Sequence, residues 1–127
     1  MYSAGVRTRL SCTHSLPLED EEERAPHSHD YVIDWQLWTD GLSQKGYAVD
    51  INRIRTSLDR LTADLEGKDL NRIGFFAGRQ PSVENLALYM TRQLRDLLGE
   101  EATAISRSEL KIWEAEDAWA GYVEQWD

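Results

Sequence analysis

Alternation of apolar and polar side chains over residues 2–14 is the feature that most constrains the fold of this chain. Val6 and Leu10 fall on even positions of the segment, whereas Arg7 and Arg9 fall on odd positions. Successive side chains of a β-strand point to opposite faces of a sheet. A period of two therefore predicts a strand with one buried face and one polar face.

Similar alternation occurs at three other places along the chain. Residues 31–37 carry large apolar side chains at every second position, and a polar loop of residues 15–26 separates them from the first strand. Leu110 and Ile112 share one face of a third expected strand, and a fourth is expected at residues 119–125. The loop between the first two strands is longer than a hairpin needs, and such loops often carry function.

The middle of the chain changes to a helical period. Apolar residues spaced by three and four predict a helix over residues 51–65, with Asp50 placed to cap its N-terminus. Pro81 and Ser82 open a second expected helix, which ends near Gly99. The expected order is ββααββ, an α+β arrangement in which two helices cover one face of an antiparallel sheet.

Length and charge restrict the class of protein. With 127 residues the chain has the size of one domain, which we place at residues 1–127. Its net charge of −9 opposes binding to nucleic acid or to an anionic membrane surface. The first ten residues lack the apolar segment of a secretory signal. We therefore expect a cytoplasmic protein that binds neither nucleic acid nor membrane.

Three histidines form a candidate metal site. His27 and His29 lie two residues apart at the start of the second strand, so both rings point to the same side. His14 ends the buried face of the first strand, and pairing of the two strands would bring all three rings together. A lone His-x-His pair is a weak signal, but three imidazoles with an open fourth position are typical of catalytic zinc. Spacing by itself leaves metal binding open, and three imidazoles suit Zn²⁺ and other divalent ions.

The segments that carry these histidines have recognisable sequences. Residues 10–16 read Leu-Ser-Cys-Thr-His-Ser-Leu, and residues 27–31 read His-Ser-His-Asp-Tyr. They resemble the Phe-x-Ala-x-His-x-Leu strand and the His-Gly-His-x-Tyr motif of the 6-pyruvoyl-tetrahydropterin synthase and 6-carboxy-tetrahydropterin synthase family. Further matching segments, in chain order, are Gly46–Asp50, Leu70-Asn71, Pro81–Ala87 and Lys111–Glu114. Six collinear motifs are much more specific than any one of them.

The resemblance implies the T-fold of this family and its oligomeric barrels, commonly hexamers built from two trimers. It also implies a pterin-like small-molecule substrate. The family glutamate that matches Glu114 binds the pterin ring. Glu114 shares strand parity with Leu110 and Ile112, which turns its carboxylate toward the buried side. The alternative is a strand-end glutamate that reaches solvent. Ser82 matches a family threonine near the ring, but it is equally placed to cap the second helix.

Two catalytic features of the family are missing from this chain. Family synthases carry a cysteine shortly before His-Gly-His, and an Asp-His pair in an Asp-His-x-x-Leu-Asn motif. Here Glu23 lies where some members have cysteine, and Glu66 and Gly67 precede the segment that ends in Leu-Asn. A glutamate replaces the cysteine in a family branch that shortens the side chain of dihydroneopterin triphosphate. Glu23 is therefore the first candidate base, with Glu21 and Glu22 as alternatives.

Two further residues are candidates for catalysis. Cys12 shares strand parity with His14 and is a possible nucleophile, although a small buried core cysteine is the competing interpretation. Glu66 keeps a carboxylate near the missing Asp-His pair, but all three histidines of the chain are already assigned to the metal.

These observations together predict a zinc-dependent lyase and homo-oligomer. We expect it to act on the side chain of a pterin-like substrate by cleavage, epimerisation or elimination. Two alternatives remain open at this level: a family member recruited to a biosynthetic pathway with a non-pterin substrate, and a catalytically inactive zinc-binding assembly subunit.

Overall fold

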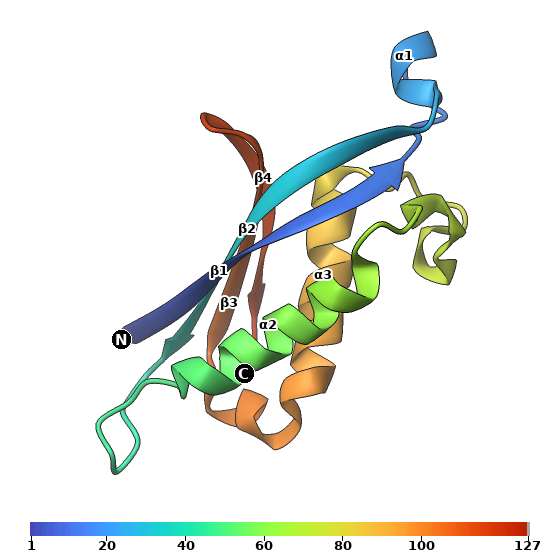
Figure 1. Ribbon diagram of the computed structural model, residues 1–127. Helices are drawn as coiled ribbons and strands as arrows, with labels where there is room; N and C mark the ends of the chain where they lie inside the picture. The colour runs from blue at the N-terminus through green and yellow to red at the C-terminus, as the bar shows by residue number, and fades with distance from the viewer. Residues whose placement is uncertain (127) are drawn as a thin grey trace.

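Four strands and two long helices make up most of the structure, a computed structural model that describes residues 1–126. The strands form one antiparallel sheet in the order β1-β2-β3-β4, and the long helices cover one of its faces (Figure 1). The strands are β1 (Tyr2–His14), β2 (His27–Thr39), β3 (Arg107–Ala115) and β4 (Ala118–Gln125). The α-helices are α1 (Glu21–Arg24), α2 (Ile51–Leu65) and α3 (Val83–Leu98). Three short 3-10 helices are η1 (Leu70–Arg72), η2 (Gly74–Phe76) and η3 (Gly99–Ala104).

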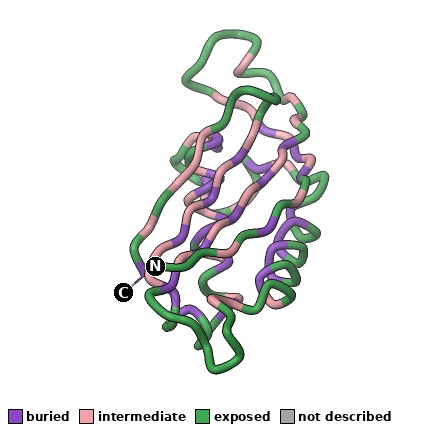
Figure 2. The backbone as a smooth tube through the Cα atoms, turned by 90° about the vertical axis from the view of Figure 1, so that its left-hand side faces the viewer, coloured by how far each residue is buried: buried purple, intermediate pink, exposed green. Residues whose placement is uncertain are grey.

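The β1–β2 hairpin pairs along its whole length. Its ladder runs from Tyr2 opposite Thr39 to His14 opposite His27, so residues directly across from one another share a face of the sheet. Even positions of β1 and odd positions of β2 lie on the face covered by the helices. Figure 2 shows buried residues alternating with more exposed ones along the strands. The two strands predicted from period-two patterns are confirmed.

The hydrophobic core lies between this face and the two long helices. Trp35 and Ile33 of β2 pack there with the apolar stripes of α2 and α3, which include Leu58 and Leu86. All four side chains are at most 1% exposed. Burial of each large apolar side chain contributes roughly 1.5–3 kcal/mol, so this layer supplies the main force that holds the helices on the sheet.

The helix ends lie where the sequence placed them. The carboxylate of Asp50 accepts hydrogen bonds from the backbone N–H groups of Asn52 and Arg53 at the start of α2. At the start of α3, the hydroxyl of Ser82 accepts from the N–H of Asn85 at 3.1 Å. Gly99 ends α3 with φ of 59°, a conformation that glycine adopts without steric cost. The predicted ββααββ order is confirmed.

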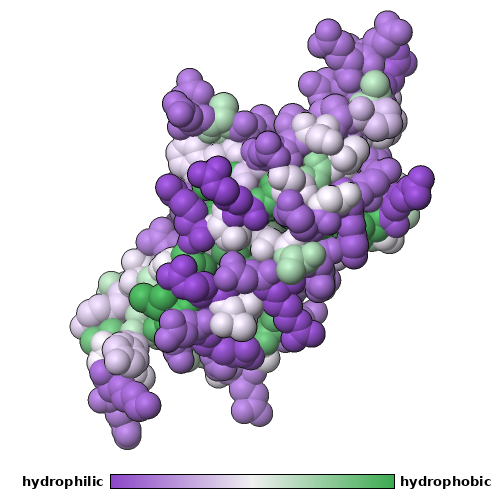
Figure 3. Space-filling view, viewed as in Figure 1, coloured by the Kyte–Doolittle hydropathy of each residue, from purple (hydrophilic) through white to green (hydrophobic). Residues whose placement is uncertain are grey.

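The loop between β1 and β2 differs from its prediction. Residues 15–26, expected to be a polar loop, contain the one-turn helix α1, whose N-cap is Asp20. This helix projects beyond the end of the hairpin (Figure 1), and mainly hydrophilic residues cover this end of the molecule in Figure 3. Among residues 1–126, no helix has the length and apolar character that a membrane crossing requires.

Candidate metal centre and active site

The three histidines meet at the end of the β1–β2 hairpin. The centroids of their rings are 4.5 to 4.9 Å apart, and one ring nitrogen from each lies within 4.8 Å of the others. His14 is 3% exposed, whereas His27 and His29 are partly buried. The convergence predicted from strand parity is therefore confirmed. Their role as metal ligands stays a prediction.

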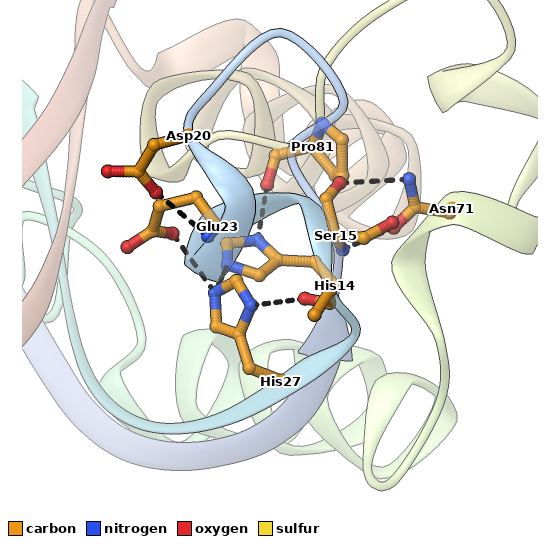
Figure 4. A network of polar contacts seen from close by, with 8 residues as sticks. His14, Ser15, Asp20, Glu23, His27, Asn71 and Pro81 are labelled. Carbon is orange, nitrogen blue, oxygen red and sulfur yellow. Dashed lines mark hydrogen bonds and ion pairs between the residues drawn. The ribbon is translucent and has the colours of Figure 1, made fainter.

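Backbone carbonyls orient two of the three rings. Nδ1 of His14 lies 2.7 Å from the carbonyl oxygen of Pro81, and Nδ1 of His27 lies 2.8 Å from that of Ala25 (Figure 4). A carbonyl oxygen only accepts hydrogen bonds, so each Nδ1 carries the proton and donates it. The Nε2 atom of each neutral ring is then left with its lone pair directed into the site. Metal-binding histidines are typically oriented in this way.

The contact between these two Nε2 atoms tests whether a cation fits. They lie 2.9 Å apart, and two lone pairs repel at that distance unless a cation or a proton lies with them. Burial lowers the pKa of His14, against the opposing effects of the Pro81 carbonyl and the charge of Glu23, so the neutral ring is favoured. Neutral imidazole nitrogens gathered in this way are the usual ligands of a divalent transition metal.

His29 is held by its neighbour two residues along the strand. Its ring stacks on the ring of Tyr31 with centroids 5.3 Å apart and an angle of 18° between the planes. Tyr31 is buried, and burial, followed by the charges of Cys12, Glu114 and Glu23, raises the pKa of its hydroxyl well above the ordinary value. Tyr31 therefore stays neutral and forms a rigid aromatic support behind the third histidine.

Glu23 lies directly beside the histidines. It is the third residue of α1, and its Oε2 atom is 3.3 Å from Nε2 of His27. Its side chain is 47% exposed, so the carboxylate contacts both the triad and solvent. The short helix is capped by Asp20, whose carboxylate accepts from the N–H of Glu23 at 3.2 Å (Figure 4). The structure thus brings the first candidate base to the histidines, while Glu21 and Glu22 are exposed on the same helix.

Cys12 is buried under the site. It lies directly opposite His29 in the ladder and is 3% exposed. Burial, reinforced by the charge of Glu66, raises the pKa of its thiol to about 12. A thiol that keeps its proton at neutral pH is a poor nucleophile. The interpretation as a small buried core residue is therefore the better supported of the two.

Glu66 has a structural contact at the edge of the sheet. It follows the last residue of α2, and its Oε2 atom accepts a hydrogen bond from the backbone N–H of Ser11 at 3.1 Å. The next residue, Gly67, donates its N–H to the carbonyl of Ser11 at 2.7 Å. This segment is thereby fastened to β1. Glu66 is exposed, and it does not join the Glu23 carboxylate at the triad.

Glu114 corrects a prediction from strand parity. Its carboxylate was expected on the buried side, but the residue is exposed in the single chain. The β3–β4 pairing shifts register between Trp113 and Ala115, and the β2–β3 ladder ends at Trp113, so Glu114 lies in an irregular stretch beyond the core. It remains near the site, because its charge contributes to the raised pKa of Tyr31.

Ser82 caps α3 and is partly buried. The capping interpretation is therefore confirmed. Contact of this residue with a substrate stays a prediction.

Comparison with protein-family models gives one match that spans almost the whole chain. The family described as 6-pyruvoyl tetrahydropterin synthase matches residues 4–125. The chain belongs to the 6-pyruvoyl tetrahydropterin synthase family. The resemblance seen in its short motifs is thereby confirmed.

Relatives with known activity or structure fall in the same family. A dihydroneopterin monophosphate aldolase of Pyrococcus furiosus is 24% identical over 111 residues, which cover 87% of this chain and 88% of the relative. The 6-pyruvoyl tetrahydropterin synthase of Caenorhabditis elegans superposes with a TM-score of 0.78 at 18% identity, covering 98% of this chain and 96% of that one. The predicted T-fold is confirmed by this likeness.

A third similar protein is a synthase with an altered catalytic residue. The 6-pyruvoyltetrahydropterin synthase of Plasmodium vivax superposes with a TM-score of 0.74 at 14% identity, covering 98% of this chain and 99% of that one. The structure is a mutant in which a catalytic glutamate is replaced by alanine. In another structure of that protein the same glutamate is replaced by cysteine.

Sequence reasoning missed several residues that shape this family site. The carbonyls of Pro81 and Ala25 have no side-chain signal, because any residue supplies a carbonyl. Tyr31 and Asn71 were visible only as members of the family motifs, and nothing in the local pattern indicated what they contact. The contacts of Pro81 and Asn71 join segments that are 67 and 56 residues apart along the chain.

Proposed function

We propose that this protein is a zinc-dependent lyase that acts on the side chain of a reduced pterin. One observation carries the proposal: the carboxylate of Glu23 lies 3.3 Å from a triad histidine whose Nε2 lone pair faces that of a second histidine. This places a candidate base next to a candidate metal site. The aldolase named for the relative from P. furiosus and the catalytic glutamate of the P. vivax protein support the same assignment.

The residues divide into binding and proton-transfer roles. We assign His14, His27 and His29 as the residues that would hold a zinc ion, which would supply a Lewis acid for a substrate oxygen. Glu23 accepts a proton from a hydroxyl of the substrate side chain. The bond between this hydroxyl carbon and the side-chain carbon attached to the ring then breaks. The hydroxyl carbon becomes a carbonyl, and the electron pair of the broken bond passes into the ring imine of the dihydropterin. A proton returned to the remaining carbon completes a retro-aldol cleavage.

Glu114 and Ser82 are the proposed contacts for the pterin ring. A carboxylate matches the two adjacent N–H donors of the ring edge in a bidentate hydrogen bond. Exposure of Glu114 in the single chain leaves its oxygens available for such a ligand. Cys12 and Glu66 rank below Glu23 as catalytic candidates, because one is a buried thiol of raised pKa and the other is bound to the backbone of Ser11.

We further propose that residues 1–127 form one T-fold domain that assembles into a homo-oligomer of trimers. Membership of the 6-pyruvoyl tetrahydropterin synthase family supports this assembly. Light scattering of the purified protein measures the subunit number, and a stable monomer would contradict the assembly without affecting the metal site.

Calorimetric titration of the zinc-loaded protein with dihydroneopterin and its phosphates tests the proposed substrate class. We expect binding to the native protein and loss of most binding in Glu114→Gln, because the amide cannot accept both ring donors. Mass spectrometry of the reaction mixture should then detect the shortened pterin together with the released aldehyde. Absence of binding to every reduced pterin would reject the substrate class, and binding without any product would reject the lyase activity.

A further inference from the structure

The loop that carries Glu23 is attached to the body of the protein by two amide side chains. Oδ1 of Asn71 accepts the N–H of Ser15 at 2.8 Å, and Nδ2 of Asn71 donates to the carbonyl of Ser15 at 3.0 Å (Figure 4). Farther along the same loop, Oε1 of Gln80 accepts the N–H of Leu18 at 2.8 Å. Both amides belong to the connection between α2 and α3, which is 56 and 62 residues away in sequence from the groups they bind.

The segment around Gln80 is itself fixed at the start of α3. The carbonyl of Gln80 accepts from Nδ2 of Asn85 at 2.8 Å, and Asn85 is part of the capped first turn of the helix. The neighbouring carbonyl of Pro81 accepts from the ring of His14. One short segment therefore contacts both a triad histidine and the loop that carries the carboxylate.

The glutamate has little other support. None of the four residues of α1 is buried, and a single helical turn is not stable by itself in water. Within the loop, the N–H of Leu16 donates to the carbonyl of Glu23 at 2.7 Å, so the position of Glu23 follows the position of residues 15–18. Those residues are the ones that Asn71 and Gln80 bind. Displacement of the loop would move the carboxylate, whereas the histidines would stay on their paired strands.

We propose that Asn71 and Gln80 are positioning residues that hold the carboxylate of Glu23 against the histidine triad. This inference rests on the proposed function, because it assigns the two amides a role in the step that Glu23 performs. The side-chain hydrogen bonds of the two amides go to the loop, at Ser15 and Leu18, so the amides act through the loop. Their effect should therefore fall on turnover and not on metal binding.

Two substitutions at each amide test the proposal, because alanine removes every side-chain hydrogen bond and the matching acid keeps only those in which the side chain accepts. The side chain of Gln80 acts as an acceptor from Leu18, so Gln80→Ala should lower kcat by at least about tenfold and Gln80→Glu should restore it. Asn71 both accepts and donates, so Asn71→Asp should recover only part of the loss seen in Asn71→Ala. KM and zinc affinity should stay near the native values in all four variants. Gln44→Ala, an exposed glutamine in the loop after β2, is the matched control.

Amide hydrogen exchange of residues 15–24 gives a readout that needs no substrate. We expect faster exchange in Gln80→Ala and Asn71→Ala than in the native protein, and near-native exchange in Gln80→Glu. Unchanged kcat in both alanine variants, or a parallel fall in zinc affinity, would overturn the positioning role. If the native protein turns over no pterin, the proposed function fails, while unchanged exchange would separately show that the amides do not hold the loop.

Discussion

The histidines of the site lie on two paired strands, whereas its carboxylate lies on a one-turn helix in the loop between them. His14 and His27 occupy the last pair of a ladder that extends over thirteen residues of each strand. Glu23 is held by an N-cap and by a loop that two distant amides fasten. The geometry of the three histidines therefore follows from sheet pairing, and the position of the candidate base follows from a few side-chain contacts.

This difference should separate metal binding from turnover, two properties that are often lost together when an active site is damaged. Sheet pairing is supported by many backbone hydrogen bonds and by the core beneath it, so a surface substitution leaves the triad in place. A loop fixed by three or four hydrogen bonds moves when one is removed, since each contributes only about 1 kcal/mol. Binding of the metal and turnover should consequently respond to different substitutions.

Removal of one triad ligand should have the largest effect. His29→Ala should lower zinc affinity by about 100-fold or more, because two imidazoles and water replace three imidazoles. Calorimetry or metal analysis after dialysis measures this directly. Ser28→Ala is the matched control, since Ser28 is the preceding residue of the same strand and faces the opposite side. Native zinc affinity in His29→Ala would show that the triad is not the metal site.

Replacement of the carboxylate should give the next largest effect, on turnover alone. Glu23→Gln should lower kcat by about 100-fold, because the amide keeps the size of the side chain and cannot accept the proton. Zinc affinity should remain near the native value. Glu22→Gln changes the same charge one residue earlier on the exposed helix and should retain turnover. Equal activity of Glu23→Gln and the native enzyme would remove Glu23 from the mechanism.

Loss of the α3 cap should have a moderate effect on stability. Ser82→Ala removes the acceptor for the N–H of Asn85 and should lower the free energy of unfolding by about 1 kcal/mol, measured by urea denaturation. Ser82→Asp keeps a capping oxygen and should restore stability. If Ser82→Asp folds normally yet loses pterin binding, the residue contacts the substrate in addition to capping the helix.

Substitution of Cys12 should have the smallest effect on turnover. Burial raises the pKa of its thiol from the ordinary value of 9.0 to about 12, so the folded protein keeps the neutral thiol at pH 8. We expect no alkylation by iodoacetamide at that pH until the protein is unfolded, and near-native kcat in Cys12→Ala. Between pH 9 and 12 the unfolded chain loses this proton while the folded chain keeps it, so stability should fall as pH rises. Rapid native-state alkylation with loss of activity would instead identify Cys12 as a nucleophile.

Prediction from the sequence succeeded where neighbours along the chain decide the outcome. Parity placed His14, His27 and His29 on one face because alternation is a property of every extended strand. It failed at Glu114, where the shift in register at the end of β3 leaves the residue exposed. It also left residues 15–26 as a loop without structure. Asp20 caps α1 locally, but the bonds that fix the loop at Ser15 and Leu18 come from Asn71 and Gln80, far along the chain.

The sequence by itself determined the order of elements, the buried face of the first three strands, the helix caps and the set of three histidines. These features depend on periodicity and on local hydrogen bonds, which short stretches of chain specify. Only the tertiary structure decided that Glu23 and no neighbouring acid lies beside the triad, and that Cys12 is buried with its proton retained. Both outcomes depend on how the α2–α3 connection packs against the sheet. Local sequence carries no information about this packing, because the segments involved are far apart along the chain.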